Sequence, residues 1–343
     1  MRVFRRFLSG GPSIELDRVL HQIHQGNRIS FQARLGSLSL PQLTQVTATV
    51  AAQYRATGDR RRLVNNLELL AEAVGDGKSE DKLTLLEIFT KNQFPAKSLI
   101  AHMPLEALNQ FEFAEFISSC ASVRCRPEER KVHDFIRTHD MRILKAPQIA
   151  ALTEALSSLS LLKNEKVVRI LISSFFNSPA DFHASAQMLS ALFVSLIVPP
   201  QAVIDSLWAN VGSNVSKVAE FDQAVIAEFS AVAKIGGLIV CHRDVEFSVP
   251  PDDIRSRMRA AILAGMPSEV CASAGVRMGL SGLSQVDVLV EGTRGLVAAP
   301  PSAFLFSHET ELTQIEKFKL FILKAYLGDH VAVLNWLQID TKS

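Results

Sequence analysis

The chain has 343 residues, of which 48% are hydrophobic and 21% are charged. This length allows two or three domains of about 100–200 residues each, with apolar surface for every core, so disorder of the whole chain is excluded. Because 36 Lys and Arg balance 35 Asp and Glu, no global field draws the chain to nucleic acid, membranes or acidic substrates. Any basic site must be local.

The first dozen residues have the composition of a mitochondrial targeting segment. Arg2, Arg5 and Arg6 stand among Phe, Val and Leu, and no acid occurs before Glu15. On a helix these residues give an arginine-rich side and an apolar side, as in mitochondrial transit peptides. We therefore predict that residues 1–12 direct the protein to the mitochondrial matrix. The alternative is an ordinary frayed basic terminus.

Residues 13–244 are predicted to form an α-helical domain. From about residue 37 onward, apolar residues recur three and four apart between Pro, Gly, Asn or Asp residues, without strand alternation. Pro147 and the segment Ser178–Asp181 mark two helix starts. The clearest predicted helices cover residues 43–54, 61–74, 82–89, 111–123 and 149–162.

Apolar residues in several of these helices share one pattern of spacing, with offsets of 0, 3, 7 and 10. The sets are Phe113, Phe116, Cys120 and Val123; Ile149, Leu152, Leu156 and Leu159; Ala186, Leu189, Phe193 and Leu196; and, in part, Leu43, Val46 and Val50. A period of about 36 residues is typical of helical hairpins that stack on a shared core. Alternatively, unrelated amphipathic helices share these offsets, because no fixed Trp or Gly recurs.

Residues 245–343 are predicted to form a small α/β domain, with a boundary near residues 244–255. Short β-branched runs alternate with helical patterns. The Gly-rich segment Gly275–Gly282 lacks a Lys and favours a packed loop over a phosphate cradle. The predicted order is an extended segment at 245–251, a helix at 252–264, strands at 285–290 and 295–299, a turn at Pro300–Pro301, a helix at 309–327 and a strand at 330–336.

This C-terminal order resembles a RAP domain. The shared features are a first strand with Asp287, a second strand before a Pro pair, a helix that carries Lys319 and is closed by Gly328, and a last hydrophobic strand. RAP domains usually follow helical repeats, as in the FAST-kinase-domain proteins and related organellar RNA factors. The resemblance implies a fold similar to restriction-type nucleases and RNA binding in mitochondria or plastids. The expected fold is therefore mainly α, a helical-hairpin array followed by a small nuclease-like α/β domain.

The chain departs from the nuclease-like members of that family at the metal-binding acids. In those members an Asp of the first strand and two acids of an E-x-D motif hold a divalent metal that activates water. Asp287 is present here, but Ala298 and Pro300 stand at the two other positions. One carboxylate cannot supply the oxygen ligands that Mg²⁺ requires, and Glu291 is the nearest substitute. We predict no nuclease activity, no metal and no cofactor.

Other catalytic and metal-binding motifs are missing from the sequence. It contains no phosphate-binding or dinucleotide-binding glycine motif and no nucleophile elbow, and His21 and His24 have no further metal ligand beyond Asp17 nearby. The longest apolar stretch, residues 186–198, is too short to span a membrane. The cysteines form no CxxC pair and are interpreted as structural residues of a reducing compartment; they are Cys120, Cys125, Cys241 and Cys271.

Three groups of basic residues are the candidate RNA-binding sites. Corresponding loops of a helical array fall on one edge, so the first two groups could form a track for phosphates. Neighbouring acids such as Asp59, Glu128 and Asp252 support the alternative of a solvated or protein-docking surface. The groups are Arg55, Arg60, Arg61 and Arg62; Arg124, Arg126, Arg130 and Lys131; and Arg255, Arg257 and Arg259.

These patterns predict a non-enzymatic mitochondrial protein that binds RNA or belongs to an RNA-containing assembly such as the mitochondrial ribosome. Its partners would be mitochondrial rRNA or mRNA and other proteins, with no small-molecule substrate and no transmembrane segment. Arginine clusters would capture the RNA backbone, and helix faces or the C-terminal domain would supply shape. The alternatives are a structural subunit without RNA contact and, with less support, an RNA endonuclease.

Overall fold

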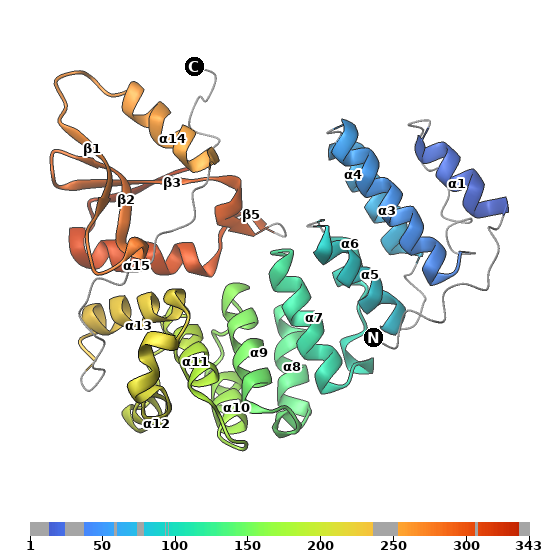
Figure 1. Cartoon of the computed structure of the whole chain (residues 1–343), viewed down its shortest axis with the longest axis horizontal. Helices are drawn as coiled ribbons and strands as arrows, with labels where there is room; N and C mark the ends of the chain where they lie inside the picture. The colour runs from blue at the N-terminus through green and yellow to red at the C-terminus, as the bar shows by residue number, and fades with distance from the viewer. Residues whose placement is uncertain are drawn as a thin grey trace. The chain divides into compact units, whose positions relative to one another are not determined.

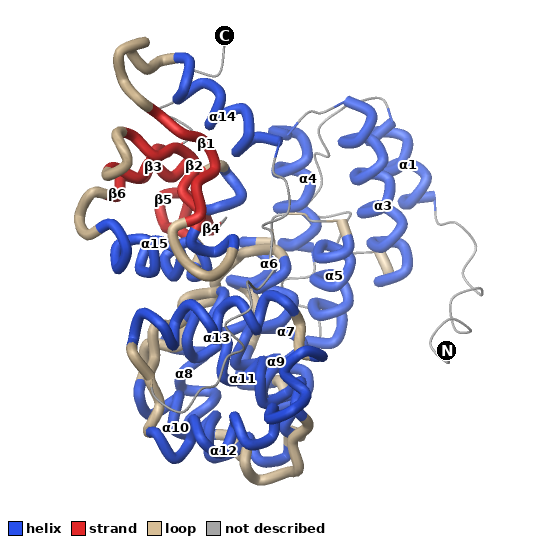
Figure 2. Tube along the Cα trace, turned by 60° about the vertical axis from the view of Figure 1, so that its left-hand side comes forward, coloured by secondary structure: helices blue, strands red, loops and turns tan. Residues whose placement is uncertain are grey.

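The computed structural model describes residues 14–24, 38–57, 60–73, 79–92, 94, 96–235, 253–305 and 308–335. This part of the chain is mainly helical, with a small mixed sheet toward its C-terminal end (Figures 1 and 2). The predicted mainly helical class with a C-terminal sheet is therefore confirmed. The targeting segment predicted over residues 1–12 lies outside the described residues.

The chain forms two compact units that do not follow the two predicted domains. Unit 1 covers Met1–Phe135 and unit 2 covers Ile136–Ser343, so the division falls within helix α8 (Glu129–Thr138). The boundary predicted near residues 244–255 falls mostly on residues 236–252, which are not described. The sheet thus belongs to the same compact unit as the helices that precede it.

Unit 1 consists of helices packed through their apolar sides. Contacts join α3 to α4 and α5, and α5 to α7. Leu43, Val46 and Val50 of α3 are buried, as their spacing predicts. The predicted helices over 43–54, 61–74, 82–89 and 111–123 are confirmed. The helices of this unit are α1 (Ile14–His24), α3 (Leu40–Thr57), α4 (Arg60–Ala73), α5 (Ser79–Lys91), α6 (Lys97–Ala101), α7 (Gln110–Ser122) and the first part of α8.

Unit 2 begins with α9 (Ala146–Ser158), α10 (Glu165–Phe175), α11 (Phe182–Val194), α12 (Gln201–Val211) and α13 (Glu220–Ala233). Helix α11 packs against α9, α12 and α13. The predicted start signals hold, since Pro147 lies in the first turn of α9 and the Asp181 side chain accepts a hydrogen bond from the Ala184 N–H at 2.8 Å.

Within the described residues, helices α7, α9, α11 and α13 end in the same way. A residue with positive φ follows each helix, and the next N–H bonds to a carbonyl five residues earlier, which satisfies a helix-terminal acceptor. Examples are Cys125 N–H to Cys120 O and Leu161 N–H to Leu156 O, both at 2.9 Å. The positive-φ residues are Arg124, Ser160, Leu196 and Lys234, and the first three are 36 residues apart.

These helix ends correct one of the predicted apolar sets. Leu196 is 39% exposed, whereas its supposed counterparts Val123 and Leu159 are buried. In the register of the helix ends, Leu196 corresponds to Ser160, so the predicted third set is one residue out of register. The physical reason is that α11 is buried on nearly all sides, from Ala184 to Val194 except Gln187. Several different sets of its apolar residues therefore have the offsets 0, 3, 7 and 10, and the spacing alone does not choose among them.

The sheet of unit 2 lies between two helices (Figure 1). Its strand order is β1-β2-β3-β6; the β1–β2 and β2–β3 pairs are antiparallel, and the β3–β6 pair is parallel. Met258 of α14 packs on Val288, and Leu323 of α15 packs on Val286. The elements are α14 (Asp253–Ala264), β1 (Ala272–Arg277), β2 (Gln285–Val290), β3 (Arg294–Ala299), α15 (Gln314–Leu327) and β6 (Val331–Asn335).

Two elements of this region differ from the prediction. Strand β1 occupies part of the segment predicted as a packed loop, and it accommodates Gly275 at a φ of +63°. The helix predicted from residue 309 begins at Gln314, because β5 (His308–Leu312) pairs with β4 (Phe304–Leu305) instead. The extended segment predicted at 245–251 lies outside the described residues.

Candidate functional site

Asp287 is buried in strand β2, where the RAP resemblance places an acid. Its side chain is 7% exposed and accepts a hydrogen bond from the Ala298 N–H of β3 at 2.8 Å. Burial raises the pKa of this carboxyl, and Glu316 adds to that effect. The hydrogen bond and the positive charges of Arg255 and Arg259 oppose it.

The groups around Asp287 form a charged cluster, which we define as Asp287, Glu316, Arg255, Arg259 and Lys319. Glu316 Oε1 lies 2.9 Å from Arg255 Nη2 and 3.1 Å from Lys319 Nζ. These three side chains are at most 18% exposed. Arg255 and Lys319 therefore form ion pairs with the buried Glu316, and little of the Arg255 side chain is exposed for contact with RNA.

The charged cluster offers ion pairing instead of a set of metal ligands. At the family's second acid position Ala298 contributes only its N–H, and Pro300 lies ahead of a short 3-10 turn. Glu291, the substitute acid considered above, is exposed in a turn at a φ of +50°. Groups of three or more His, Cys, Asp or Glu that could hold a metal ion do not occur among the described residues.

Gly328 has the place in the fold that the resemblance implies. Helix α15 ends at Leu327, and Gly328 follows with a φ of +64°. Its N–H donates to the Lys324 carbonyl at 2.8 Å. A residue without Cβ enters this conformation without steric cost, which explains a glycine at the end of this helix.

The second predicted arginine group is divided between burial and ion pairing. Arg124 is half-buried at a positive φ, and burial lowers the pKa of its guanidinium; Arg126 is also half-buried. Arg130 lies 3.8 Å from Asp134, and Lys131 lies 3.1 Å from Glu128. These exposed pairs fit the alternative of a solvated surface for the last two residues.

The other predicted basic residues are only partly described. Arg55 lies in α3 and Arg60, Arg61 and Arg62 open α4, but their side chains are outside the described set. Arg257 is exposed on α14, where its Nε donates to the Asp253 carbonyl at 3.4 Å. Within unit 2, the third group is divided, since Arg255 pairs with Glu316 and Arg257 is exposed.

The cysteines are free thiols in the described residues. Cys120 and Cys125 are buried, and burial raises the pKa of both, that of Cys125 to about 11. They pack as small apolar groups, as predicted. Cys271 is exposed, so burial does not account for it, and Cys241 lies outside the described residues.

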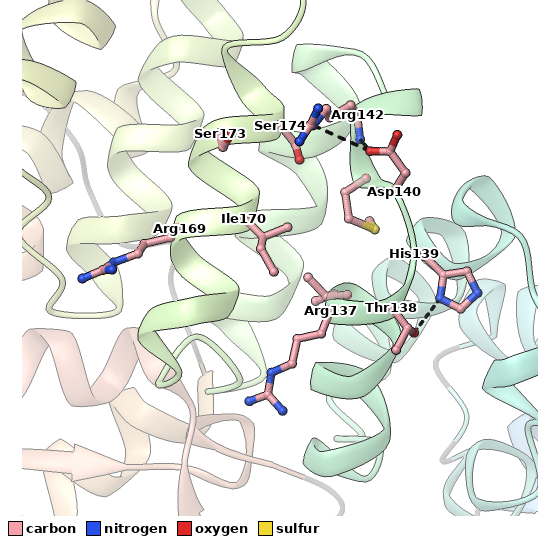
Figure 3. Close-up of a pocket in the computed structure, with 11 residues that line it drawn as sticks. Arg137, Thr138, His139, Asp140, Arg142, Arg169, Ile170, Ser173 and Ser174 are labelled. Atoms are coloured by element: carbon pink, nitrogen blue, oxygen red, sulfur yellow. Dashed lines mark hydrogen bonds and ion pairs between the residues drawn. The ribbon is translucent and has the colours of Figure 1, made fainter.

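A groove of about 510 Å³ lies between the end of α8, the 3-10 turn η3 (Met141–Ile143) and helix α10 (Figure 3). Arg137, Arg142 and Arg169 line it together with His139 and Ser173. The three arginines are exposed. Ile170 adds an apolar side chain on α10 between Arg137 and Arg142, while the Arg169 side chain extends away from Ile170 (Figure 3).

Local structure explains how these arginines are presented. Arg137 lies in the last turn of α8, where the helix dipole favours a cation. Arg142 lies 3.8 Å from Asp140, and Arg169 pairs with Glu165 one turn earlier on α10. Both pairs are more than half exposed to solvent, so an entering anion can replace the acids at small cost.

We refer to Arg137, Arg142 and Arg169 as the arginine groove. Sequence reasoning missed it because its members come from three separate elements and form no run of basic residues. The signal in the sequence that bears on it is the helical spacing, which predicts the helices that carry Arg137 and Arg169 but not which of them become neighbours.

Comparison with models of known protein families finds no match, and comparison with curated proteins finds none either. Among the described helices, none combines the length and apolar character needed to cross a membrane.

Proposed function

We infer that the protein is a non-catalytic RNA-binding component of a mitochondrial ribonucleoprotein assembly, either a ribosomal component or a factor for RNA processing or stability. The arginine groove is the observation that carries this proposal. Guanidinium groups are well suited to phosphate oxygens, and contacts to the backbone supply most of the affinity of such proteins. The volume of the groove suits one nucleotide unit.

The surroundings of the groove also suit single-stranded RNA. Ile170 provides an apolar surface between the cations. Phe176, at the end of α10, is 44% exposed, and the neighbouring Asn177 side chain donates to the Arg142 carbonyl. Phe176 is not part of the groove lining, but single-strand binders combine a basic groove with aromatic rings for base stacking, so an RNA that continues along α10 would reach this exposed ring.

The proposal includes the architecture. Helices α7, α9 and α11 begin at Gln110, Ala146 and Phe182, 36 residues apart, which supports a helical-hairpin array. The sequence of elements β2, β3, α15 and β6 supports a RAP-like domain with a nuclease-like fold. The charged cluster supports the absence of catalysis, because the positive charge of Arg255 acts on Asp287, the acid of the family's metal site that is present in this chain.

The test is salt-dependent binding of a fluorescently labelled single-stranded RNA to the purified full chain, followed by anisotropy. Replacing Arg137, Arg142 and Arg169 with Ala should weaken binding at least about tenfold and lower the slope of log affinity against log salt by about 2. Both effects follow from the loss of three phosphate contacts.

Arg294→Ala is the matched control, because Arg294 is exposed at the start of β3 and outside the groove. Its affinity should stay near that of the wild type. Equal affinity of the wild type and the groove variant would remove the groove from the RNA site. Absence of salt-sensitive binding by the wild type would favour the second candidate, a structural subunit that contacts only protein.

The predicted group at Arg60, Arg61 and Arg62 and the exposed Arg257 remain proposed backbone contacts of the same RNA. Their role is secondary in this proposal because the groove combines several cations with an apolar side chain and a defined volume.

A further inference from the structure

Glu228 of α13 is a fully buried acid with a complete set of neutral donors. Its Oε1 accepts hydrogen bonds from the Ser281 N–H at 2.6 Å, the Ser281 hydroxyl at 3.0 Å and the Ser284 hydroxyl at 2.7 Å. Its Oε2 accepts one from the Tyr326 hydroxyl at 3.2 Å. The exposed fraction of its side chain is 0%. A buried carboxylate is tolerated only when such donors replace water.

The donors come from a loop that is built around this carboxylate. The loop, residues 279–284, connects β1 to β2 and is held by internal bonds, including Gly279 N–H to Ser284 Oγ at 2.9 Å. A Cβ on Gly279 would lie 2.6 Å from both Glu228 Oε2 and the Tyr326 ring. Glycine is therefore needed here for close approach to the acid, independent of its φ.

The partners of Glu228 lie in the loop before β2 and in α15, which belong to the part of unit 2 that contains the sheet. Glu228 itself lies in α13, one of the helices that precede the sheet in the chain. Other contacts of α15 with these helices include neutral, aromatic and charged groups, among them the hydrogen bond from Lys317 Nζ to Ser160 Oγ at 3.1 Å. Gln314 Nε2 donates to the Val194 carbonyl at 3.0 Å, and the rings of Phe229 and Phe318 stack at 6.1 Å. Glu228 thus brings a fully buried acid into an interface that also contains apolar packing, neutral hydrogen bonds and the Lys317 ammonium.

We propose that the Gly279–Ser284 loop is an anion receptor whose ligand is the chain's own Glu228, and that this contact is a latch that fixes the sheet and α15 to α13. The loop offers a backbone N–H and two hydroxyls to one oxygen, which is the donor set of a phosphate or carboxylate site. Because the acid comes from α13, releasing it would free that side of the sheet. This proposal does not depend on RNA binding.

Hydrogen–deuterium exchange of the full chain tests the latch. Glu228→Ala should speed exchange in residues 279–284 and in α15 at least about tenfold, because it leaves buried donors without an acceptor. Acetate should restore protection in this variant by entering the vacated receptor, whereas chloride at equal ionic strength should not. Glu228→Gln should also lose protection, since its amide oxygen is uncharged and therefore accepts weaker hydrogen bonds from the loop than a carboxylate does.

Glu220→Ala is the control, because Glu220 is an exposed acid on the same helix, and its exchange in these segments should match the wild type. Wild-type protection in Glu228→Gln, or equal effects of acetate and chloride on Glu228→Ala, would overturn the proposal. If Glu228→Ala does not fold, Ser284→Ala and Tyr326→Phe each remove one donor. Unchanged exchange in both of these milder variants would equally overturn it.

Discussion

Asp222 of α13 is an acid whose surroundings oppose its charge. Burial raises its pKa from 3.8 to about 6, and the nearby acid Glu154 adds to the effect. A hydrogen bond with Ser190 and the proximity of His183 oppose the rise only in part. The folded protein therefore holds a proton on Asp222 more readily than the unfolded chain does.

This shift predicts how stability depends on pH. Because the pKa of Asp222 is higher in the folded state, its favourable contribution is complete below about pH 4 and is lost as pH rises through about 6. Asp222→Asn should therefore raise the free energy of unfolding at pH 7 by about 1 kcal/mol and flatten its change between pH 4 and 6. Urea unfolding at several pH values measures this.

Asp205→Asn provides the comparison for Asp222, because Asp205 is exposed on the neighbouring helix α12. Its substitution should change stability by less than about 0.5 kcal/mol at either pH. Equal destabilisation by Asp222→Asn at pH 4 and pH 7 would contradict this prediction. Such a result would show that the fold needs the Asp222 side chain for its contacts and that its negative charge does not lower stability at pH 7.

At the scale of single elements, the end of α11 carries unrelieved backbone strain. Leu196 has a φ of +60°, a conformation that disfavours residues with a Cβ, and its side chain is 39% exposed. Leu196→Gly should relieve this strain and, after the entropy cost of glycine in the unfolded chain, raise the free energy of unfolding by about 0.5–1 kcal/mol. Chemical denaturation measures the gain.

Leu196→Ala separates the backbone effect from the side-chain effect at this position. Alanine retains the Cβ and hence the strain, so this variant should show no gain in stability. Equal stability of the Gly and Ala variants would show that the strain at this helix end contributes nothing measurable.

The sequence predicts those elements whose stability depends on local patterns. The spacing of apolar residues gives α9 and α11, and the run at 285–290 gives β2, because burial of one side dictates the pattern. Strand β5 is missed because residues 308–312 become a strand only by pairing with Phe304 and Leu305. Strand β1, whose burial does not alternate, likewise depends on its partner β2.

At the scale of the whole molecule, the proposed absence of catalysis is open to direct test. RNA incubated with the purified chain and Mg²⁺ should stay intact, because Asp287 alone cannot supply the oxygen ligands that Mg²⁺ requires, and Ala298 and Pro300 occupy the two other acid positions. Gel analysis of labelled RNA provides the measurement. Mg²⁺-dependent cleavage by the wild type that disappears in Asp287→Ala would show that the protein is a nuclease.

The candidate site follows from the sequence only in part. Asp287 and Gly328 are found at their expected places on β2 and after α15, because each belongs to a local pattern. The partner of Arg255 is not predictable, since Glu316 is distant along the chain and approaches it only when α14 and α15 both pack against the sheet. The arginine groove depends in the same way on the packing of α8 and α10.

The parallel pairing of β3 with β6 has a consequence for how the chain is made. Residues 294–299 are synthesised well before residues 331–335, and α15 must form and cross over between them. Until β6 has left the ribosome, β3 exposes a row of unpaired N–H and C=O groups. It also exposes apolar side chains that are buried in the folded protein, such as Val297. A growing chain therefore passes through a stage in which this edge is open to wrong pairing, and a ribosome pause before residue 331 would prolong that exposure.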